Sequence, residues 1–477
     1  MAQRSAAADG LDSDAGASAA GHGEFPRFPK SDGGPHRASH PQSQIQNPMY
    51  SYSKLVLPNG LRVLYLEMPH IHSVVAACYV GVGSRYEDEH SLGLSHLLEH
   101  MLFRATQRFS SSVELLTAID EIGGESDAYT SPEYCAYLLR AHSRHCEDAI
   151  RFLADIVLSA NFKDADLATE KRVICEEISQ FKDVSGDYVS IDDLSYNLMW
   201  KTASLNSFSF GSEDTVQDFT RGRLLDHYHA HYLPNNMVLC VSGNFDRKRA
   251  EGVIHELFGG LQGRFEGRPA RQPSEQTEPR TAYQRIRAQM VYFKLCHKAY
   301  SYRHPKLLPM LLISDVLGGS TSSRLLSSIR ERQGLVYDIS ATPNLFSDFG
   351  SVDIYGATGK ANFLKTVAAV MTELRKLAEY GVSESELKRT EERAFTQMQL
   401  IMDSPLDMVN WFGIEELLIS PDAPDTPEKQ AEKVRNVKLD DITQVIADIF
   451  TPSKRNLALI GPCGWWQKRK VKNLLQH

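Results

Sequence analysis

The sequence predicts an α+β fold built from two homologous halves, each with an antiparallel or mixed sheet covered by helices. The chain has 477 residues, of which 42% are apolar, and this length exceeds what one hydrophobic core usually organises. Residues 263–280 are rich in Pro, Arg and Glu with almost no apolar side chain, which is typical of a linker. Beyond them, the order of expected strands and helices repeats the order in residues 49–262. The repetition indicates a duplicated unit of about 210 residues.

The first half, residues 49–262, is expected to combine short strands with amphipathic helices. Strands are indicated by apolar runs of about four to eight residues bounded by turn residues such as Pro58-Asn59-Gly60. Helices are indicated by apolar residues spaced three and four apart. The expected strands are 54–57, 61–67, 74–81, 126–130, 134–140 and 236–243, and the expected helices are 91–103, 112–123, 144–160, 164–183 and 221–231.

The second half, residues 281–477, shows the same patterns. Its expected strands are 289–296, 335–341, 348–357 and 456–461, and its expected helices are 305–317, 321–332, 361–380, 383–402 and 438–450. The N-terminal residues 1–48 differ from both halves because they are rich in Ala, Gly, Ser, Asp, Pro and His and contain few large apolar residues. That segment is therefore expected to be a disordered tail.

Charge and composition exclude several classes of protein. The net charge of −8 and the isoelectric point near 6.1 give no basic footprint for nucleic acid. No apolar run approaches the ~20 residues needed to cross a bilayer. The seven cysteines are scattered without a CxxC pair, which is typical of buried thiols in a reducing compartment. We therefore expect no membrane span and no nucleic-acid partner, and a cytoplasmic location, with a mitochondrial or other compartment left open.

The stretch 91–103, SLGLSHLLEHMLF, carries the strongest chemical signal in the chain. On a helix, His96, Glu99 and His100 share one face because positions i, i+3 and i+4 are neighbours. Two neutral imidazoles one turn apart suit Zn²⁺, and a carboxylate beside them can take a proton from water at the metal. The order H-x-x-E-H is the inverzincin signature. Paired histidines on an apolar helix also occur as plain core residues, so a third ligand is needed to decide.

A second expected helix supplies acids that could complete such a site. In DLATEKRVICEEISQ, residues 166–180, Glu170 and Glu177 are seven residues apart and therefore two turns apart on one face. One of them can bind the metal while the other supports a ligand. Glu176 points about 100° away from Glu177 and is expected to be a surface acid.

With these residues in place, the chain resembles the pitrilysin-type zinc metallopeptidases, in particular small two-domain members such as the mitochondrial processing peptidase and bacterial processing proteases. The family motif is H-x-x-E-H followed by 76 residues and a Glu, and 76 residues separate His100 from Glu177 here. The resemblance implies that His96, His100 and Glu177 bind one Zn²⁺ per chain. It implies that Glu99 is the general base, that Glu170 assists catalysis by supporting the ligands, and that the two halves close on each other like a clamshell.

The second half is expected to lack a metal. No H-x-x-E-H occurs after residue 280, and Gln397 falls where Glu177 stands when Leu167 is laid on Leu387. A unit that kept its shape and lost its metal is what the family resemblance implies.

The segment SRLLSSIRERQGLVYDIS, residues 323–340, also matches a family segment. Arg330 and Tyr337 are seven residues apart, as are an Arg and a Tyr that contact substrate in the family. The resemblance implies that both take part in catalysis by hydrogen bonding to substrate carbonyls and to the developing oxyanion. The alternative is a surface charge and a tyrosine in the core of a strand.

The segment 124–130, GESDAYT, resembles the edge strand on which the family binds peptide backbone. The resemblance implies that Ser126, Asp127 and Ala128 contact substrate. The family usually has Asn where Asp127 stands, so this chain replaces an amide with a negative charge at that position.

Together these features lead us to expect a zinc-dependent metalloendopeptidase that cleaves peptides or unfolded and leader segments inside a closed chamber. One alternative is the catalytic subunit of a heterodimeric processing peptidase. Another is a non-catalytic structural or peptide-binding subunit similar to the core proteins of respiratory complexes. The expected partners are a peptide or unfolded polypeptide substrate and a second subunit, either an identical copy or a related chain.

Overall fold

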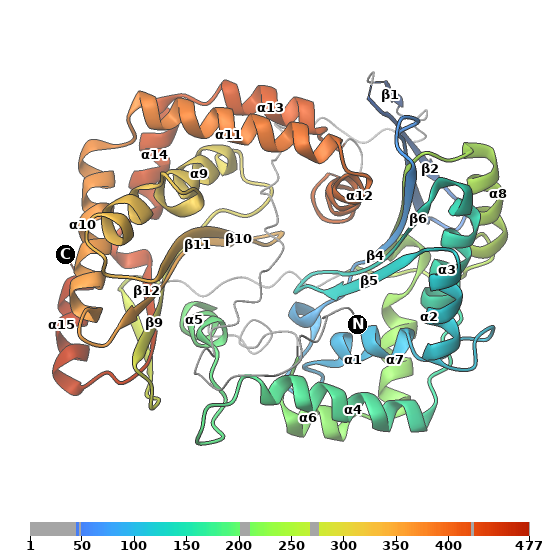
Figure 1. Ribbon diagram of the computed structural model, residues 1–477, viewed down its shortest axis with the longest axis horizontal. Helices are drawn as coiled ribbons and strands as arrows, with labels where there is room; N and C mark the ends of the chain where they lie inside the picture. The colour runs from blue at the N-terminus through green and yellow to red at the C-terminus, as the bar shows by residue number, and fades with distance from the viewer. Residues whose placement is uncertain (1–43, 47–48, 201–209, 268–275, 421–423, 477) are drawn as a thin grey trace.

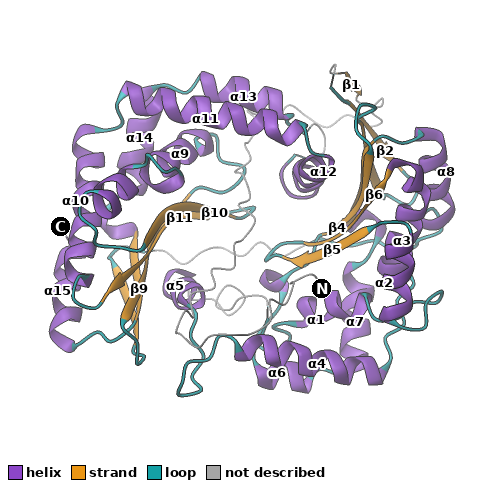
Figure 2. Cartoon of the chain, viewed as in Figure 1, coloured by secondary structure: helices purple, strands orange, loops and turns teal. Residues whose placement is uncertain are grey.

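The computed structural model describes residues 44–46, 49–200, 210–267, 276–420 and 424–476. Two sheets stand opposite each other, and most helices cover their outer sides (Figure 1). The separation into an inner pair of sheets and an outer shell of helices is clear when the chain is coloured by secondary structure (Figure 2). The predicted fold class, α+β with two halves that face each other, is confirmed.

Each half contains one sheet. The first has seven strands in the order β1 (Gln44–Gln46), β2 (Ser51–Val56), β3 (Arg62–Glu67), β7 (Met237–Gly243), β4 (Ser73–Val80), β6 (Cys135–His142) and β5 (Glu125–Thr130). The second has five strands in the order β10 (Asp338–Leu345), β11 (Gly350–Gly359), β9 (Met290–Ala299), β12 (Arg455–Ile460) and β8 (Arg280–Gln284).

The two sheets share one topology. In the first sheet β7 lies between β3, to which it is parallel, and β4, to which it is antiparallel. In the second sheet β12 lies between β8 and β9 with the same two orientations. The antiparallel strands β4, β6 and β5 likewise correspond to β9, β11 and β10. This correspondence supports the internal duplication inferred from the sequence, with β1 and β2 as additions to the first half.

The helices follow the same duplicated order. Those that precede residue 262 are α1 (Leu94–Leu102), α2 (Ser112–Glu121), α3 (Cys146–Leu158), α4 (Asp164–Ser179), α5 (Ile191–Trp200), α6 (Glu213–Asp218), α7 (Arg221–His231) and α8 (Arg247–Phe258). Those that follow are α9 (Leu307–Ser314), α10 (Phe363–Tyr380), α11 (Glu384–Met402), α12 (Pro405–Ile414), α13 (Pro427–Arg435), α14 (Leu439–Ile449) and α15 (Trp465–Gln476). Shorter helical turns are η1 (Ser84–Tyr86), η2 (Ser143–His145), η4 (Pro234–Asn236), η5 (Asp315–Gly319), η6 (Leu326–Glu331), η7 (Glu415–Ile419) and η8 (Pro452–Lys454).

Two helices pack against the sheet of the other half. The helix α5 precedes the linker but lies on β8, β9 and β12, where Lys294 Nζ donates to Asp192 Oδ1 at 2.6 Å. The helix α12 follows the linker but lies on β3, β4 and β7, where the Tyr79 hydroxyl donates to Asn410 Oδ1 at 2.7 Å. Since α5 follows α4 and α12 follows α11, the exchange is reciprocal. Neither half, divided at the predicted linker, therefore holds every helix that covers its own sheet.

Several elements differ from the sequence expectation. Residues 44–46 form β1 within the segment expected to be disordered, and the remainder of 1–48 lies outside the described residues. Of the expected linker 263–280, residues 268–275 lie outside the described part, and Arg280 begins β8, which the sequence did not indicate. The helix expected at 321–332 is centred on the short turn η6. The helices α5, α6, α8, α12, α13 and α15 were not predicted.

Candidate metal centre

The helix α1 is held at its first turn by a buried carboxylate. Glu87 accepts hydrogen bonds from the backbone N–H of Gly93 at 2.7 Å and of Ser95 at 2.6 Å. Burial raises the pKa of Glu87 to about 7 against the effect of these bonds. Gly93 has φ of +95°, and a Cβ there would lie 2.5 Å from the carbonyl oxygen of Phe210, so both backbone shape and space require glycine. The start of the motif helix is therefore fixed on two sides.

The apolar face of α1 anchors it in the core between the first sheet and its outer helices. The fully buried side chains on this face are Leu97, Leu98, Met101 and Leu102. Helix α4 packs against α1 and buries Ile174 and Ile178 in the same core. With the apolar residues of both helices turned to the core, their polar residues are left to face each other.

The structure brings together the three residues predicted to bind metal. His96 and His100 on α1 and Glu177 on α4 place their ligand atoms within 4.8 Å of one another. The two Nε2 atoms are 3.3 Å apart, and Glu177 Oε2 lies 3.8 Å from His96 Nε2 and 3.7 Å from His100 Nε2. Among the described residues this is the one group of His, Cys, Asp and Glu side chains with such an arrangement.

The spacing of these atoms fits a tetrahedral zinc ion. Ligands at the usual distances of about 2.0–2.2 Å from Zn²⁺ are separated from one another by roughly 3.3–3.6 Å, close to the separations found here. Glu177 Oε2 is buried and has no hydrogen-bond partner within the protein. A buried carboxylate oxygen without a donor is costly, and a cation at this point would satisfy it. The donor set and its geometry therefore suit Zn²⁺.

The electrostatics of the site also favour a cation. Burial and the charge of His100 lower the pKa of His96 to about 3, which keeps its ring neutral and able to donate a lone pair. Burial opposes the charged form of His100, but the hydrogen bond with Glu170 and the charges of Glu177 and Glu99 outweigh it and raise the pKa of that ring. Burial raises the pKa of Glu177, partly offset by His100. A positive charge beside these buried carboxylates stabilises their ionised form.

Glu170 contacts the Nδ1 atom of His100, in the supporting position that the family resemblance implies. Its Oε2 is 2.8 Å from His100 Nδ1, and its Oε1 forms an ion pair with Arg104. Glu170 is 1% exposed, so its orientation is fixed by these two partners. An acid on the far nitrogen of a metal-binding histidine fixes the ring and its tautomer. The sequence did not indicate the part played by Arg104, although it stands one turn after His100.

Glu99 contacts the edge strand of the first sheet. Its Oε2 accepts a hydrogen bond of 2.6 Å from the hydroxyl of Thr130, the last residue of β5. Burial raises the pKa of Glu99, and the bond from Thr130 opposes this rise. Thr130 thus links the candidate base to the strand expected to bind substrate. No sequence pattern indicates the contact between Thr130 and Glu99, because the two residues belong to different elements that are distant in the sequence.

Ser126, Asp127 and Ala128 lie in β5, which is the edge strand of the seven-stranded sheet. Within the part of the chain that the structure describes, they pair with β6 on one side only, and Asp127 is opposite Leu138. The Asp127 side chain is exposed, and its Oδ1 accepts a hydrogen bond of 3.0 Å from the Ala128 N–H. The free edge required for backbone pairing with a peptide is present.

Among the described residues, no hydrogen bond or ion pair joins Arg330 or Tyr337 to His96, His100 or Glu177. Tyr337 is 80% exposed just before β10, and its backbone N–H donates to the carbonyl of Ala357. Arg330 lies in η6 and has Glu331 at 3.8 Å as its ion-pair partner. The alternative expectation for Tyr337, a residue in the core of a strand, is wrong, since its ring is exposed. Their contact with substrate stays a prediction.

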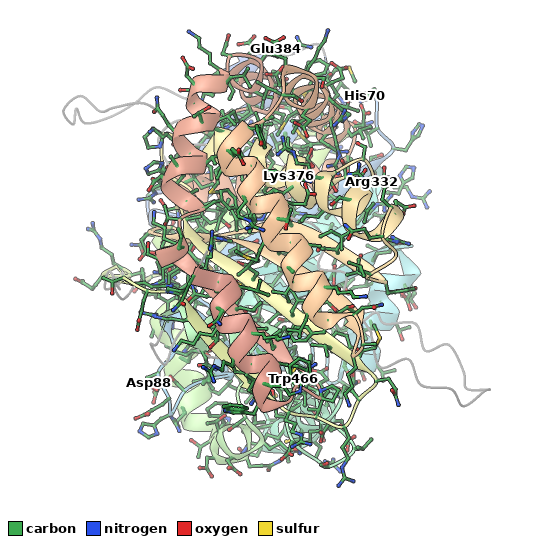
Figure 3. All side chains as sticks on the ribbon, turned by 90° about the vertical axis from the view of Figure 1, so that its left-hand side faces the viewer. His70, Asp88, Arg332, Lys376, Glu384 and Trp466 are labelled. Atoms are coloured by element: carbon green, nitrogen blue, oxygen red, sulfur yellow. The ribbon has the colours of Figure 1, made fainter. Side chains whose placement is uncertain are left out.

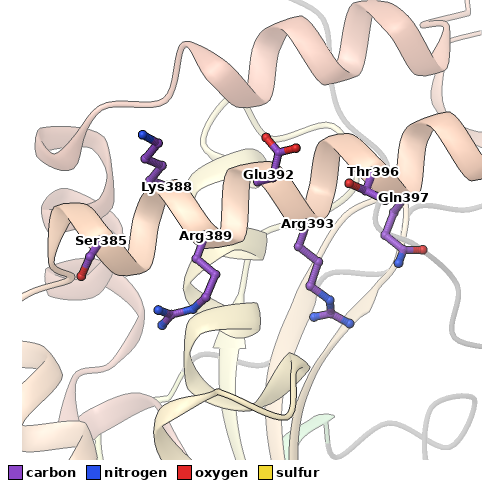
Figure 4. A pocket seen from close by; sticks show the side chains of 7 residues that line it. All are labelled: Ser385, Lys388, Arg389, Glu392, Arg393, Thr396 and Gln397. Carbon is purple, nitrogen blue, oxygen red and sulfur yellow. The ribbon is translucent and has the colours of Figure 1, made fainter.

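The counterpart of the metal helix α4 in the second half is α11, which lines a cavity of about 750 Å³ (Figure 4). Lys388, Arg389 and Arg393 point from this helix, and Arg393 forms an ion pair with Asp315 of η5. Gln397, which the internal repeat places opposite Glu177, also lines the cavity. In the described part of the second half, Arg393 and Gln397 lie on the α11 face that corresponds to the Glu170 and Glu177 face of α4, and Thr390 takes the position of Glu170.

His227 and His231, a second pair of histidines four residues apart on a helix, make contacts that support the fold. His227 on α7 lies 3.0 Å from the Ser95 hydroxyl, so it supports the first turn of α1. Burial lowers its pKa to about 3, together with the charge of His231. His231 Nδ1 lies 2.9 Å from the His227 carbonyl oxygen, within its own helix.

A duplicated α+β shell, in which one half alone gathers the histidines of an H-x-x-E-H helix and a glutamate from a second helix, is the architecture of an inverzincin-type peptidase. The chain belongs to the insulinase family, peptidase family M16. The family model described as insulinase (peptidase family M16) matches residues 62–207, and the model described as the peptidase M16 inactive domain matches residues 218–393.

Relatives and solved structures agree with this assignment. The chain is 30% identical over 407 residues to the uncharacterized zinc protease YmxG of Bacillus subtilis, covering 85% of this chain and 97% of the relative. It is 29% identical over 407 residues to an uncharacterized zinc protease of Rickettsia felis, covering 85% and 96%. A protease from Helicobacter pylori has a similar fold, with a TM-score of 0.79 at 19% identity, covering 87% of this chain and 100% of that one. A structure titled peptidase M16 inactive domain, from Pseudomonas fluorescens, gives 0.77 at 17% identity, covering 87% and 98%.

Proposed function

We propose that the protein is a zinc-dependent endopeptidase that hydrolyses peptides or unfolded polypeptide segments, leader segments included, between its two halves. The observation that carries the proposal is the convergence of His96, His100 and Glu177 with Glu99 beside them. Membership of family M16 and relatives named as zinc proteases support it. We assign one Zn²⁺ to each chain, since the described residues contain one group with metal-ligand spacing and Gln397 stands where the internal repeat places the counterpart of Glu177.

The side chains divide the work of hydrolysis between them. His96, His100 and Glu177 would hold Zn²⁺, which when bound supplies the Lewis acidity that activates water and polarises a carbonyl. Glu99 would take the proton of the attacking water and pass it to the leaving amine, a task suited to a carboxylate whose pKa is raised by burial. Glu170 would keep the His100 ring in place. Thr130 would hold Glu99 at the end of the substrate strand.

Substrate would bind by pairing its backbone with the free edge of β5, beside Ser126, Asp127 and Ala128. A peptide held there runs toward Thr130 and hence toward Glu99. Arg330 and Tyr337 would approach the reacting carbonyl from the second half once substrate fills the chamber. The exposed ring of Tyr337 is free for such a contact.

The test combines metal content with cleavage. After dialysis the protein should retain about one zinc per chain, and a peptide library read by mass spectrometry should show internal cleavage that a chelator stops and zinc restores. The variant Glu99→Gln should retain its zinc and lose cleavage, because its amide cannot accept the proton. Undiminished cleavage by this variant, or a dialysed protein free of zinc, would contradict the proposal and favour a non-catalytic peptide-binding subunit.

Association with a second subunit and a cytoplasmic location belong to the same proposal. Size-exclusion chromatography of the active fraction will distinguish a chain that is active alone or as a homodimer from one that requires a related partner.

A further inference from the structure

The C-terminal helix α15 exposes two adjacent tryptophans. Trp465 is 75% exposed and Trp466 is 53% exposed, whereas the two other tryptophans of the chain, Trp200 and Trp411, are 1% exposed each. Large aromatic side chains are normally buried because their apolar area is costly to leave in water. Two exposed indoles side by side indicate a surface that is covered in use.

Four cations accompany the tryptophans on the same helix, whose sequence WWQKRKVKNLLQ contains no acid. Lys468, Arg469, Lys470 and Lys472 have no ion-pair partner among the described residues. Lys470 Nζ lies 5.2 Å from the centre of the Trp466 ring, and Lys468 Nζ lies 4.8 Å from that of Tyr283. In a chain with a net charge of −8, this helix is a local concentration of positive charge.

The helix is firmly attached, so its exposed face is not the result of a loose end. One side of α15 is buried against the rest of the second half, through side chains spaced four residues apart: Gln467, Val471 and Leu475. The Gly464 N–H donates to Gln467 Oε1 at 2.8 Å, and Arg455 Nη1 donates to the carbonyl of Leu475 at 2.8 Å. Both ends of α15 are thus held to the fold.

The position of α15 separates it from the metal centre. It lies on the outer side of the second half, across the molecule from α1 and α4 (Figure 1). Seen from that side, α15 runs across the face of the molecule with Trp466 at its lower end (Figure 3). A partner could cover this face without obstructing the space between the two sheets.

We propose that α15 is a docking surface for a membrane that contains anionic phospholipids. Indole rings concentrate at the boundary between headgroups and acyl chains, and lysine and arginine beside them are attracted to anionic headgroups. Charge complementarity therefore points to a negatively charged occupant, and the paired indoles favour lipid over an acidic protein or nucleic acid. Attachment would be peripheral, since no described helix combines the length and apolar character needed to cross a bilayer.

The experiment uses the full-length protein and vesicles of phosphatidylglycerol mixed with phosphatidylcholine, compared with phosphatidylcholine alone. We expect co-sedimentation with the anionic vesicles and a blue shift of tryptophan emission, because Trp465 and Trp466 are the two tryptophans that can change environment. Raising the salt concentration to about 1 M should release the protein by screening the cations.

Two variants locate the binding surface. Trp465→Ala with Trp466→Ala should remove both the blue shift and most of the binding. Replacing Lys468, Arg469, Lys470 and Lys472 by Gln should weaken binding by roughly fivefold for each charge removed. The matched controls lie on the first half: Lys248→Gln on α8 and Val113→Ser on α2, where Val113 is 72% exposed. Both controls should bind like the parent.

Several results would overturn the proposal. They are a parent protein that does not sediment with anionic vesicles, α15 variants that sediment as well as the parent does, and binding to duplex DNA without binding to vesicles. Binding that persists at about 1 M salt would also contradict a headgroup interaction carried by these cations. The comparisons between vesicle types and between salt concentrations use the unmodified protein. They therefore test the proposal even if a variant folds poorly.

Discussion

His100 Nδ1 lies 2.8 Å from Glu170 Oε2, and the other oxygen of that carboxylate is held by Arg104. Glu170 thus connects the Arg104 side chain to the His100 ring. Because Glu170 is buried, its charge is not dispersed by water and acts on the imidazole at close range. We therefore expect the affinity of the proposed zinc site to depend on a residue that does not bind the metal.

The first prediction concerns this support. Glu170→Gln should lower the affinity for zinc by about 10- to 100-fold, because the amide no longer fixes the ring as a carboxylate does. Competition with a chelator of known affinity measures the change. Glu176→Gln is the matched control, since Glu176 is exposed on the same helix one residue before Glu177. Equal zinc affinity in the two variants would show that Glu170 has no part in holding the metal.

The second prediction concerns Arg85, which pairs with a buried carboxylate of its own half and with a carboxylate of the other half. Arg85 in η1 binds Glu133 at 2.6 Å and Asp348 at 2.5 Å, and Glu133 also accepts from the Ser347 N–H at 2.9 Å. Arg85→Met should lower the free energy of unfolding by about 3–5 kcal/mol, because Glu133 stays buried without its cation. Urea unfolding measures this loss, and small-angle scattering measures any separation of the halves.

Two further variants test that explanation. Arg85→Met combined with Glu133→Gln should recover part of the lost stability, because the stranded charge is removed. Arg151→Met breaks an exposed pair with Glu256 within the first half and should change stability little. If Arg85→Met behaves like Arg151→Met, the contact does not hold the halves together.

The sequence predicted the structure best where the local spacing of residues is enough to define a helix or a strand. The helix predicted at 221–231 and the acids placed two turns apart on 164–183 depend on local spacing, which a helix converts directly into position. The duplicated order of elements likewise predicted two matching sheets. Local spacing therefore placed His96 and His100 on one helix face and left Glu170 and Glu177 as alternative acids, and the choice of Glu177 came from the resemblance to the family.

What the sequence did not reveal depends on contacts between distant segments. The exchange of α5 and α12 follows from which sheet each helix meets, and their own patterns carry no such information. Thr130 and Arg104 act through partners placed by tertiary packing. Arg330 and Tyr337 were assigned by family resemblance, and their exposed positions leave that role a prediction.

The third prediction concerns acid stability. His297 on β9 is fully buried, packs against Phe450 and has no hydrogen bond on either ring nitrogen. Burial, with the charges of Arg455 and Lys454, lowers its pKa to about 3. The unfolded chain takes up a proton near pH 6.5 and the folded chain does not, so stability is full above pH 6.5 and falls as the pH drops toward 3. Between pH 7 and 5 the loss from this residue is about 2 kcal/mol.

His297→Leu should flatten that pH dependence. Urea unfolding at pH 7 and at pH 5, with a chelator present in all samples, should show a drop that is smaller by about 2 kcal/mol than in the parent. His90→Leu removes a histidine that is 78% exposed and should leave the dependence as it is in the parent. A parent-like slope in His297→Leu would mean that the buried ring does not resist protonation.

The fourth prediction concerns cleavage specificity and assumes the proposed peptidase activity. On β5 the side chain of Thr130 faces α1, whereas Tyr129 faces α12, where its hydroxyl donates to Asn410. Side chains alternate along a strand, so Asp127 lies on the same face as Tyr129, toward the second half. A substrate strand paired with β5 would place one residue opposite Asp127 at about 5 Å between Cβ atoms.

A lysine at that substrate position should be preferred to a glutamate by roughly fivefold in kcat/KM, because the carboxylate attracts one and repels the other. Asp127→Asn should reduce the preference to less than about twofold while zinc content stays unchanged. Glu125→Gln is the control, since Glu125 already has Arg140 at 3.7 Å to balance its charge. Paired peptides that differ at one residue, assayed at two salt concentrations, measure the effect. A preference that survives in Asp127→Asn would place the charge selection on another part of the chamber, and loss of the preference in Glu125→Gln as well would indicate a general field rather than one side chain.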